Sequence, residues 1–435
     1  RYEKIIVSEL IPLLEQFEGE KIWSELETID DLLYRAALED AVLDPEMLKN
    51  HAPKLVFTPI HGTGAIASIP ALWDHGVEVA VVDEQNVQDP NFGTVKSPNP
   101  ENPEALKLGI NVARKTKCDL ILGSDPDCDR IGVAAKKKNG TFECLSGNQV
   151  ACMLAEYRLS VLKRKQLLND GTAKGFAILK TFVTSPLLSK IATGQGVRCV
   201  NTPTGFKWMA KKLRKYEEDA SLEMKEKEGV SLDYDDTELF TRIQILSKYS
   251  TYVALAAEES YGYLPLDLVR DKDGNASALS IAELFAFLKS IKSNADDFLN
   301  TIYLKHGYHL EKTENIYFEG AQGSDTIKRL ANSYRSEPLK SIDSTPVKKT
   351  QDFLVPGFID EDEDPLPREN FIVLQLENGF NVAIRPSGTE PKIKYYLFGC
   401  GDRNPADLEK SKDLVIEKVD SLASWLLRDA ESRTE

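Results

Sequence analysis

The run Asp119-Leu120-Ile121-Leu122-Gly123-Ser124-Asp125-Pro126-Asp127-Cys128-Asp129-Arg130 places three carboxylates directly after a short apolar segment. Residues 119–122 are typical of a buried β-strand, and the polar residues from Gly123 onward form a loop at its end. In open α/β sheets, ligands bind at the carboxyl ends of the strands. Residues 123–130 are therefore predicted to form a ligand-binding loop at the edge of an α/β sheet.

The three aspartates of this loop predict a magnesium site. Asp125, Asp127 and Asp129 occupy alternate positions, so their carboxylates project to one side of an extended chain. They repel one another unless a cation lies between them. Oxygen ligands suit Mg²⁺, which completes its octahedron with waters or substrate oxygens. An acidic turn at a strand end is the structural alternative.

Two other kinds of carboxylate site are alternatives to a magnesium site. An EF-hand loop starting at Asp125 needs glycine at its sixth position and a carboxylate at its twelfth. Arg130 and Lys136 stand there, so the EF-hand is excluded. A phosphatase-type nucleophilic aspartate, followed two residues later by a second aspartate, stays open.

The chain around this loop alternates between strand and helix patterns. Strands that alternate with helices pair in parallel through crossover connections. The pattern restarts near Ser146, and residues 217–237 are charged enough to predict a surface excursion. The predicted strands are 55–57, 77–82, 119–122, 175–182, 197–201 and 252–257, and the predicted helices are 65–73, 104–115, 148–162 and 273–288.

The last part of the chain has a different pattern. Residues 371–376 and 380–384 flank Asn378-Gly379, which predicts a β-hairpin. A strand over 392–398 and a helix over 406–427 follow. We therefore predict two successive mixed α/β domains, residues 1–145 and 146–303, and an α+β C-terminal domain, residues 304–435. The spacing of Ile5, Leu10, Leu13, Leu14 and Phe17 predicts a helix near the start of the sequence.

Composition excludes several classes of function. A formal charge of −15 over 435 residues argues against a nucleic-acid partner but allows a local basic pocket for an anionic metabolite. The apolar runs are too short to span a membrane, so no membrane partner is expected. The six cysteines form no Cys-x-x-Cys pair, which favours reduced thiols in a cytoplasmic enzyme.

Two further motifs suit phosphate and sugar binding. Residues 385–391, Arg-Pro-Ser-Gly-Thr-Glu-Pro, combine a guanidinium, two hydroxyls and a glycine, which suits an anion cradle or an ordinary Ser-Gly turn. Glu258-Glu259-Ser260 follows an apolar strand, where carboxylates and a hydroxyl can bind sugar hydroxyls or simply face water.

A competing hypothesis starts from Gly62-Thr63-Gly64. These residues begin a G-x-G-x-x-A pattern between a strand and a helix, and Asp83 lies about 20 residues further on. That is the fingerprint of a dinucleotide site, so an NAD-dependent oxidoreductase is the alternative function. It leaves the Asp125 cluster without a role.

Taken in order, these motifs resemble those of the α-D-phosphohexomutases, the phosphoglucomutase/phosphomannomutase family. The resemblance covers nearly the whole chain. Residues 58–64, Thr-Pro-Ile-His-Gly-Thr-Gly, are similar to the opening of the family's second domain, and residues 202–207, Thr-Pro-Thr-Gly-Phe-Lys, to a third-domain active-site loop. Arg270-Asp271-Lys272-Asp273-Gly274 matches a motif whose lysine lies near the reacting phosphate.

The resemblance implies a role for each matching residue. It implies that the metal ligands are Asp125, Asp127 and Asp129, and that Arg130 and Lys272 are catalytic. The substrate-binding residues that it implies are Thr204, Gly205, Lys207, Glu258, Ser260, Arg385, Ser387, Gly388 and Thr389.

Two departures from the family pattern stand out. Ala257 occupies a position where the sugar loop usually has glycine. The family's first domain carries Thr-Ala-Ser-His-Asn-Pro or a close variant, and we find no such segment in this sequence. Ser97-Pro98-Asn99-Pro100 echoes it only superficially, and we interpret Ser97 as a structural loop residue. The phosphoserine-bearing N-terminal domain of the same protein is therefore expected as a further partner.

The implied reaction interconverts hexose 1-phosphate and hexose 6-phosphate through a bisphosphate. Mg²⁺ is the implied cofactor, hexose phosphate the substrate, and glucose 1,6-bisphosphate an activator of the complete enzyme. Without a carrier serine, these 435 residues are expected to bind hexose phosphate but not to turn it over. Preference among glucose, mannose and pentose phosphates stays open.

Overall fold

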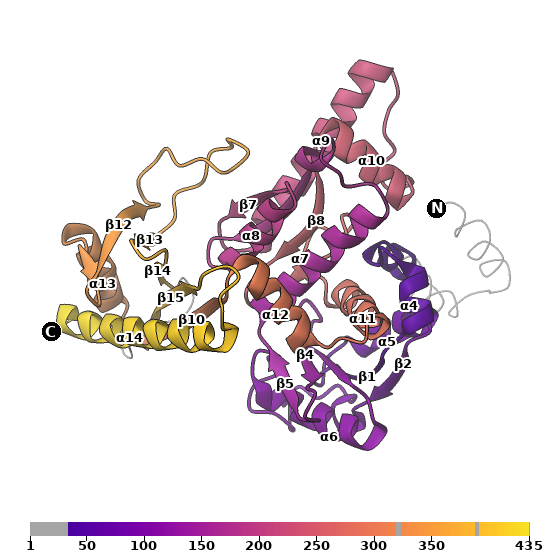
Figure 1. Ribbon diagram of the computed structural model, residues 1–435, viewed down its shortest axis with the longest axis horizontal. Helices are drawn as coiled ribbons and strands as arrows, with labels where there is room; N and C mark the ends of the chain where they lie inside the picture. Colours follow the sequence, from indigo (N-terminus) through magenta and orange to yellow (C-terminus); the bar gives the residue numbers. More distant parts are fainter. Residues whose placement is uncertain (1–33, 319–322, 388–390, 435) are drawn as a thin grey trace, which may run out of the picture. The chain divides into compact units, whose positions relative to one another are not determined.

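The computed structural model describes residues 34–318, 323–387 and 391–434, which form two compact units (Figure 1). The first unit takes in the chain up to Thr181 together with Ile191–Val200 and Thr204–Phe298. The second comprises Phe182–Lys190, Asn201–Pro203 and the chain from Leu299. The helix predicted around Ile5 to Phe17 lies outside the described residues, and the division into three domains stays a prediction.

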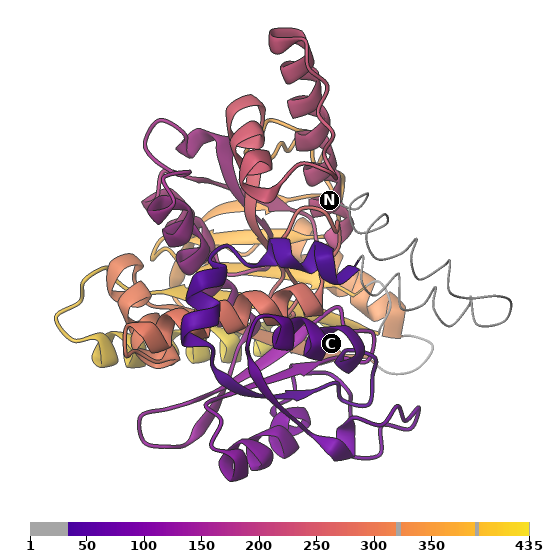
Figure 2. The same ribbon diagram turned by 90° about the vertical axis from the view of Figure 1, so that its right-hand side faces the viewer.

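The first unit contains a five-stranded sheet in the order β2-β1-β3-β4-β5. The parallel part, β2-β1-β3, confirms the crossover connections expected from the alternating pattern, while β4 and β5 pair antiparallel. Helices lie on both faces, α6 on one and α5 on the other (Figure 2). The strands are β1 (Lys54–Thr58), β2 (Glu78–Val81), β3 (Leu120–Ser124), β4 (Ile131–Lys136) and β5 (Phe142–Leu145), and the helices are α4 (Pro45–His51), α5 (Ala65–Asp74) and α6 (Lys107–Thr116).

Strand alternation explains how this sheet is packed. Val56, Ile121 and Ala134 point to the face that carries α6, where they form one buried cluster with Leu106 and Ala113. Their neighbours along the strands, such as Leu55 and Leu122, are also buried, because helices cover the opposite face as well.

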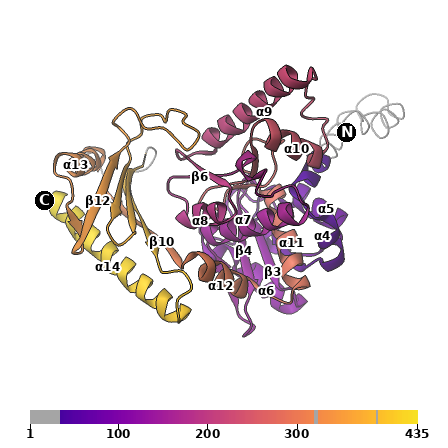
Figure 3. The same cartoon turned by 45° about the horizontal axis from the view of Figure 1, so that its top comes forward.

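A second sheet follows in the order β7-β6-β8-β9, and every residue of its central strand β8 is buried. Figure 3 shows α7 and α11 beside it. The strands are β6 (Phe176–Thr181), β7 (Arg198–Thr202), β8 (Tyr252–Ala257) and β9 (Tyr263–Leu264), and the helices are α7 (Gly147–Arg164), α8 (Pro186–Gly194), α9 (Phe206–Glu228), α10 (Leu239–Tyr249), α11 (Gly274–Ser290) and α12 (Ala295–His306).

Residues 217–237, predicted as a surface excursion, are mostly exposed or half-buried, and their first half is helical. Helix α9 continues to Glu228 and ends at Gly229, which adopts a φ of 71°. The charged residues there are good helix formers, and they pair one turn apart, as Lys227 and Glu223 do at 2.6 Å. The many charged and few large apolar residues of this segment therefore indicate that it is exposed, but they do not distinguish a helix from a loop.

Buried polar side chains hold the start of the described chain against the second sheet. Arg158 on α7 is fully buried and donates to the backbone carbonyls of Ala41 at 2.8 Å and of Ala254 at 2.7 Å. Glu283 on α11 accepts from the backbone N–H groups of Leu43 at 3.0 Å and Asp44 at 2.7 Å. These bonds satisfy charges that would otherwise make burial costly.

Arg242 on α10 forms two ion pairs that are almost completely buried. Its guanidinium donates to both carboxylate oxygens of Asp267, at 2.9 and 2.7 Å, and to Asp40 at 2.7 Å. Burial lowers the pKa of Arg242, but the hydrogen bonds and charges of Asp267 and Asp40 outweigh it and leave the pKa above its ordinary value. Asp40 and Asp267, 227 residues apart in the chain, are thereby held by one side chain.

The second unit is built on a six-stranded antiparallel sheet in the order β10-β15-β14-β13-β12-β11. Helices α13 and α14 contribute to its apolar core, and the predicted hairpin is confirmed, with Gly379 at a φ of 83°. The elements are β10 (His309–Tyr317), α13 (Gly323–Ser336), β11 (Ser341–Ile342), β12 (Thr345–Asp352), β13 (Ile372–Leu376), β14 (Asn381–Pro386), β15 (Lys392–Cys400) and α14 (Leu408–Thr434).

All six cysteines are free thiols. Among the described residues, no helix combines the length and apolar character that crossing a bilayer requires.

Replacing Arg242 by alanine should destabilise the protein by about 3–5 kcal/mol, because two buried carboxylates lose their cation. Differential scanning calorimetry should show a clearly lower melting temperature. Arg214→Ala is the matched control, since Arg214 pairs with Glu218 on the exposed side of α9 and its loss should cost less than about 1 kcal/mol. Equal melting temperatures of the two variants would show that the buried pairs do not stabilise the fold.

Candidate active site

The aspartate loop connects β3 to β4, which are antiparallel neighbours. The backbone N–H of Cys128 donates to the carbonyl of Asp125 at 3.1 Å, and Cys128 adopts a φ of 57°. The chain thus turns back on itself, and one carboxylate oxygen of Asp125 accepts the N–H groups of Asp129 at 3.1 Å and Arg130 at 3.0 Å. Asp125 therefore stabilises the conformation of its own loop and is also a candidate metal ligand.

The three carboxylates come together as predicted. Asp125, Asp127 and Asp129 each offer an oxygen, and these oxygens lie within 4.8 Å of one another. The pKa of Asp125 is raised to about 7, chiefly by burial; the bond from the Arg130 N–H opposes this rise, and the charges of Asp129 and Asp127 contribute to it. Around Mg²⁺, ligand oxygens about 2.1 Å from the ion lie roughly 3.0–4.2 Å apart. The donor set and its spacing fit a divalent cation.

Two cations flank the carboxylates. The ammonium group of Lys272 lies 2.8 Å from one oxygen of Asp129, and only 15% of the Lys272 side chain is exposed. The Nε of Arg130 lies 3.8 Å from Asp125 and 3.7 Å from the other oxygen of Asp129. Within the described ranges, that Asp129 oxygen and the Arg130 Nε are buried and have no hydrogen-bond partner. The Arg130 Nε can therefore donate a hydrogen bond to a ligand oxygen, and the Asp129 oxygen can bind a cation.

Close backbone contacts on two sides position the loop. A Cβ at Gly62 would lie 2.2 Å from the Cα of Pro126, and the adjacent Thr63 N–H donates to the Pro126 carbonyl at 2.9 Å. On the other side, a Cβ at Gly274 would lie 2.6 Å from the Cys128 carbonyl oxygen, which accepts the Gly274 N–H at 2.9 Å. Only glycine leaves room for these contacts.

Glu258 brings the predicted sugar loop to the same part of the unit. Its carboxylate is buried and accepts the backbone N–H of Gly205 at 3.0 Å. Burial and the neighbouring Glu259 raise the pKa of Glu258, while the Gly205 N–H and the positive charges of Lys272 and Arg130 lower it. The loop of Gly205, the loop of Glu258 and the aspartate loop are therefore electrostatically coupled.

The remaining predicted residues of this unit lie beside these loops. Thr204 is half-buried, and its hydroxyl has no hydrogen-bond partner among the residues that the structure describes. This hydroxyl can therefore bind a ligand. Ser260 is half-buried in the turn after β8, and Lys207 is exposed at the start of α9 with its ammonium 5.3 Å from the Trp208 ring centre.

Arg385 and Ser387 belong to the second unit. Arg385 is half-buried near the end of β14, opposite Lys394 of β15, and the N–H of Ser387 donates to the Lys392 carbonyl at 2.9 Å. Gly388 and Thr389 lie outside the described residues.

Sequence reasoning missed the polar network behind the aspartate loop. The Asn275 carboxamide oxygen accepts from Ser68 at 2.6 Å and from the Cys128 thiol at 3.4 Å, and its nitrogen donates to the Tyr34 hydroxyl at 2.9 Å. Tyr34 in turn donates to Asp273 at 2.7 Å. Among these residues only Asp273, as a helix-capping candidate, had a local signal, because the others meet through long-range packing.

Comparison with known proteins agrees with this architecture. Residues 34–140 match domain II and residues 146–227 match domain III of the family described as phosphoglucomutase/phosphomannomutase, alpha/beta/alpha. This chain belongs to the α-D-phosphohexomutase family. The fold is accordingly that of the phosphohexomutases, two mixed α/β sheets with their helices and a C-terminal sheet domain.

Individual relatives support the same assignment. The chain is 32% identical to a phosphopentomutase of Pongo abelii over 84% of its own length and 57% of the relative's. It is 30% identical to a phosphoglucomutase of Staphylococcus aureus (strain MRSA252) over 79% of its own length and 56% of the relative's. The chain thus spans about half the length of these curated relatives.

A solved structure shares the fold. The open form of parafusin, a phosphoglucomutase of Paramecium, aligns with 89% of this chain and 62% of its own, with a TM-score of 0.55 and 17% identity.

The dinucleotide hypothesis is not favoured in a phosphohexomutase. In this chain the turn at Gly62 packs against the backbone of Pro126, and both the N–H and the hydroxyl of Thr63 donate to the Pro126 carbonyl, the hydroxyl at 3.1 Å. The sequence matches the fingerprint because both contain a strand, a glycine turn and a helix. In this chain the glycine, Gly62, leaves room for the aspartate loop and not for a dinucleotide.

Gly62→Ala should lower stability by about 1–3 kcal/mol, because the added Cβ forces the turn and the aspartate loop apart. The melting temperature measured by calorimetry should fall. Gly171→Ala is the control, since Gly171 is exposed and its added Cβ would meet only the Asn169 side chain, at 3.2 Å. An unchanged melting temperature for Gly62→Ala would mean that the two loops are not packed as described.

Proposed function

We propose that this chain carries the magnesium and sugar-binding parts of a phosphohexomutase that transfers a phosphoryl group between the 1- and 6-positions of a hexose phosphate. The observation that carries the proposal is the convergence of three carboxylates, Lys272 and Glu258 in one unit of a phosphohexomutase-family chain. The phosphopentomutase and phosphoglucomutase relatives support sugar phosphate as the substrate class.

Mg²⁺ would be held by Asp125, Asp127 and Asp129. When bound, it offsets negative charge on the oxygens of a phosphoryl group in transfer. Lys272 and Arg130 supply fixed positive charge beside the same carboxylates, at 2.8 Å and 3.7 Å from Asp129. We therefore assign both residues to stabilisation of the transferring phosphoryl group.

The sugar would be bound by Glu258 and Ser260, with Thr204, Gly205 and Lys207 from the neighbouring loop. A buried carboxylate that already accepts one N–H, as Glu258 does from Gly205, retains acceptor capacity for sugar hydroxyls. Arg385, Ser387, Gly388 and Thr389 of the second unit would bind a phosphate group, because a guanidinium, two hydroxyls and a glycine suit an anion.

A covalent carrier is needed for turnover by this route, and no serine of the printed sequence lies in a carrier motif. We propose binding without turnover for these 435 residues. A coupled dehydrogenase assay with glucose 1-phosphate, Mg²⁺ and glucose 1,6-bisphosphate tests this, and activity that Ser97→Ala abolishes would contradict it.

The metal assignment predicts that Asp127→Asn weakens Mg²⁺ binding at least tenfold, because a neutral amide replaces an anionic ligand. Isothermal titration calorimetry with MgCl₂ measures the affinity. Asp170→Asn, a change of the same kind at an exposed aspartate, should leave it unaltered. Identical isotherms for the Asp127 variant and the unmodified chain would move the metal elsewhere.

The substrate assignment predicts that glucose 1-phosphate raises the melting temperature and that NAD does not, since a ligand of the folded state stabilises it by mass action. Stabilisation by NAD alone would favour the oxidoreductase instead.

Glu258→Gln should weaken sugar-phosphate binding by roughly tenfold, because a hydrogen bond to a charged acceptor contributes about 1.5–3 kcal/mol.

A further inference from the structure

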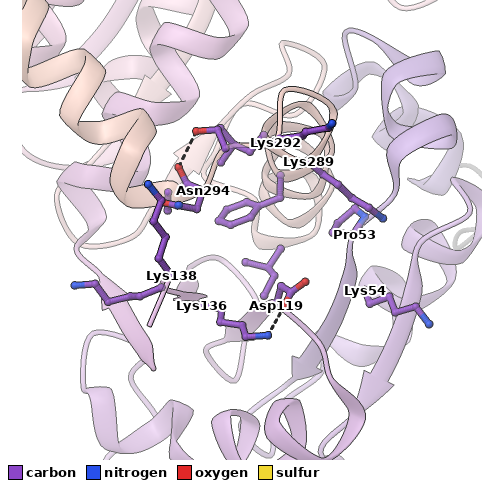
Figure 4. Close-up of a pocket in the computed structure, with 14 residues that line it drawn as sticks. Pro53, Lys54, Asp119, Lys136, Lys138, Lys289, Lys292 and Asn294 are labelled. Carbon is purple, nitrogen blue, oxygen red and sulfur yellow. Dashed lines mark hydrogen bonds and ion pairs between the residues drawn. The ribbon is translucent and has the colours of Figure 1, made fainter. Parts of the chain in front are cut away.

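A basic pocket of about 400 Å³ lies in the first unit at the end of the sheet remote from the aspartate loop. Its walls come from the start of β1, the start of β3, the end of β4, the end of α11 and the turn that leads to α12 (Figure 4). Pockets of this size accommodate small metabolites.

The residues that line this pocket are mostly basic, whereas the protein as a whole is acidic. Lys54, Lys136, Lys137, Lys138, Lys289 and Lys292 line it, together with the single acidic residue Asp119. Figure 4 shows the labelled lysines on different sides of the pocket, from β1, β4 and the end of α11. In a chain with a net charge of −15, a lining with six lysines and one aspartate is locally basic, and the lysines without a carboxylate partner can attract an anion.

Part of this charge is available to a ligand. Four of the six lysines pair with carboxylates: Lys136 with Asp119 at 2.9 Å, Lys138 with Asp297 at 2.8 Å, Lys54 with Glu78 at 2.6 Å and Lys137 with Glu143 at 2.5 Å. Lys54, Lys136 and Lys138 are exposed, and ion pairs at exposed positions are weak. Lys289 donates to the neutral carbonyl of Ala52 at 2.8 Å. Within the described part of the chain, neither Lys289 nor Lys292 has a carboxylate partner, so these two cations are uncompensated.

Apolar side chains form another part of the pocket lining. Leu120, Leu288 and Pro53 are buried, and Phe285 is half-buried and keeps part of its ring accessible in the pocket. A small inorganic anion would leave the accessible part of Phe285 without a contact. An anion with a flat apolar ring could contact Phe285 while its phosphates reach the lysines.

This pocket is separate from the proposed active site. Strand β3 runs from Leu120 in the pocket to Ser124 next to Asp125, about 13 Å at 3.3 Å per residue. Helix α11 runs from Gly274, which contacts the aspartate loop, to Phe285 in the pocket, about 16 Å at 1.5 Å per residue. A ligand of the size of the pocket cannot occupy both places.

We propose that this pocket is a second ligand site, which binds a soluble anion with several phosphate groups and a flat apolar ring, of the nucleoside polyphosphate class. Lys289 and Lys292 bind the phosphates, and Phe285 contacts the ring. The inference does not depend on the mutase assignment, because it uses none of the residues of the candidate active site.

ATP is the probe, titrated into the full chain by calorimetry in buffer with EDTA so that no metal participates. ATP should bind, more tightly than tripolyphosphate, and its affinity should fall as salt is raised. Lys289→Gln/Lys292→Gln should weaken ATP binding tenfold or more, because two charge-assisted contacts are lost. Phe285→Leu should bring the affinity for ATP close to that for tripolyphosphate.

Two matched variants complete the experiment. Lys211→Gln/Lys225→Gln removes the same charge from exposed positions on α9, and Lys272→Gln removes the cation beside the aspartate loop. Both should retain ATP binding within about threefold. The proposal is overturned if ATP does not bind at millimolar concentration, if tripolyphosphate binds equally well, or if either matched variant weakens ATP as much as the pocket variant.

Discussion

The close contact between the aspartate loop and two glycine-bearing turns is the constraint on which the site depends. Three backbone segments meet there at distances that exclude any side chain at Gly62 or Gly274. Their N–H groups also satisfy the loop's carbonyls at Pro126 and Cys128. Backbone packing thus holds the carboxylates together in spite of their mutual repulsion. A cation that binds there would find its ligands already in place.

Buried charged side chains fix the packing of the start of the described chain in the first unit. Arg158, Glu283 and Arg242 each bond to groups far away in the sequence, and each is almost completely shielded from water. Breaking any of these bonds would leave a buried group unpaired, which costs more than the bond itself contributes. The network therefore favours one arrangement of residues 40–44 against α7, α10 and α11.

Helix α11 connects the two places where charge is concentrated. Its N-terminal residues bind the aspartate loop, and Asp273 caps the helix there. Its last two turns carry Phe285, Leu288 and Lys289, which line the basic pocket. Most of the helix between these ends is buried. One rigid element thus separates a cluster of carboxylates from a cluster of lysines within a single unit.

The sequence by itself determined whatever depends on neighbours along the chain. Alternate aspartates after an apolar strand indicated the carboxylate cluster, strand and helix periodicities predicted most elements, and Asn378-Gly379 located the hairpin. The helix over residues 217–228 was missed because a charged, weakly apolar run predicts exposure in helix and loop alike. Tertiary structure alone decided the Asn275 network, the partners of Arg242 and the lysine pocket. Their members lie up to about 240 residues apart, and only packing of sheets and helices brings them within hydrogen-bonding or electrostatic range.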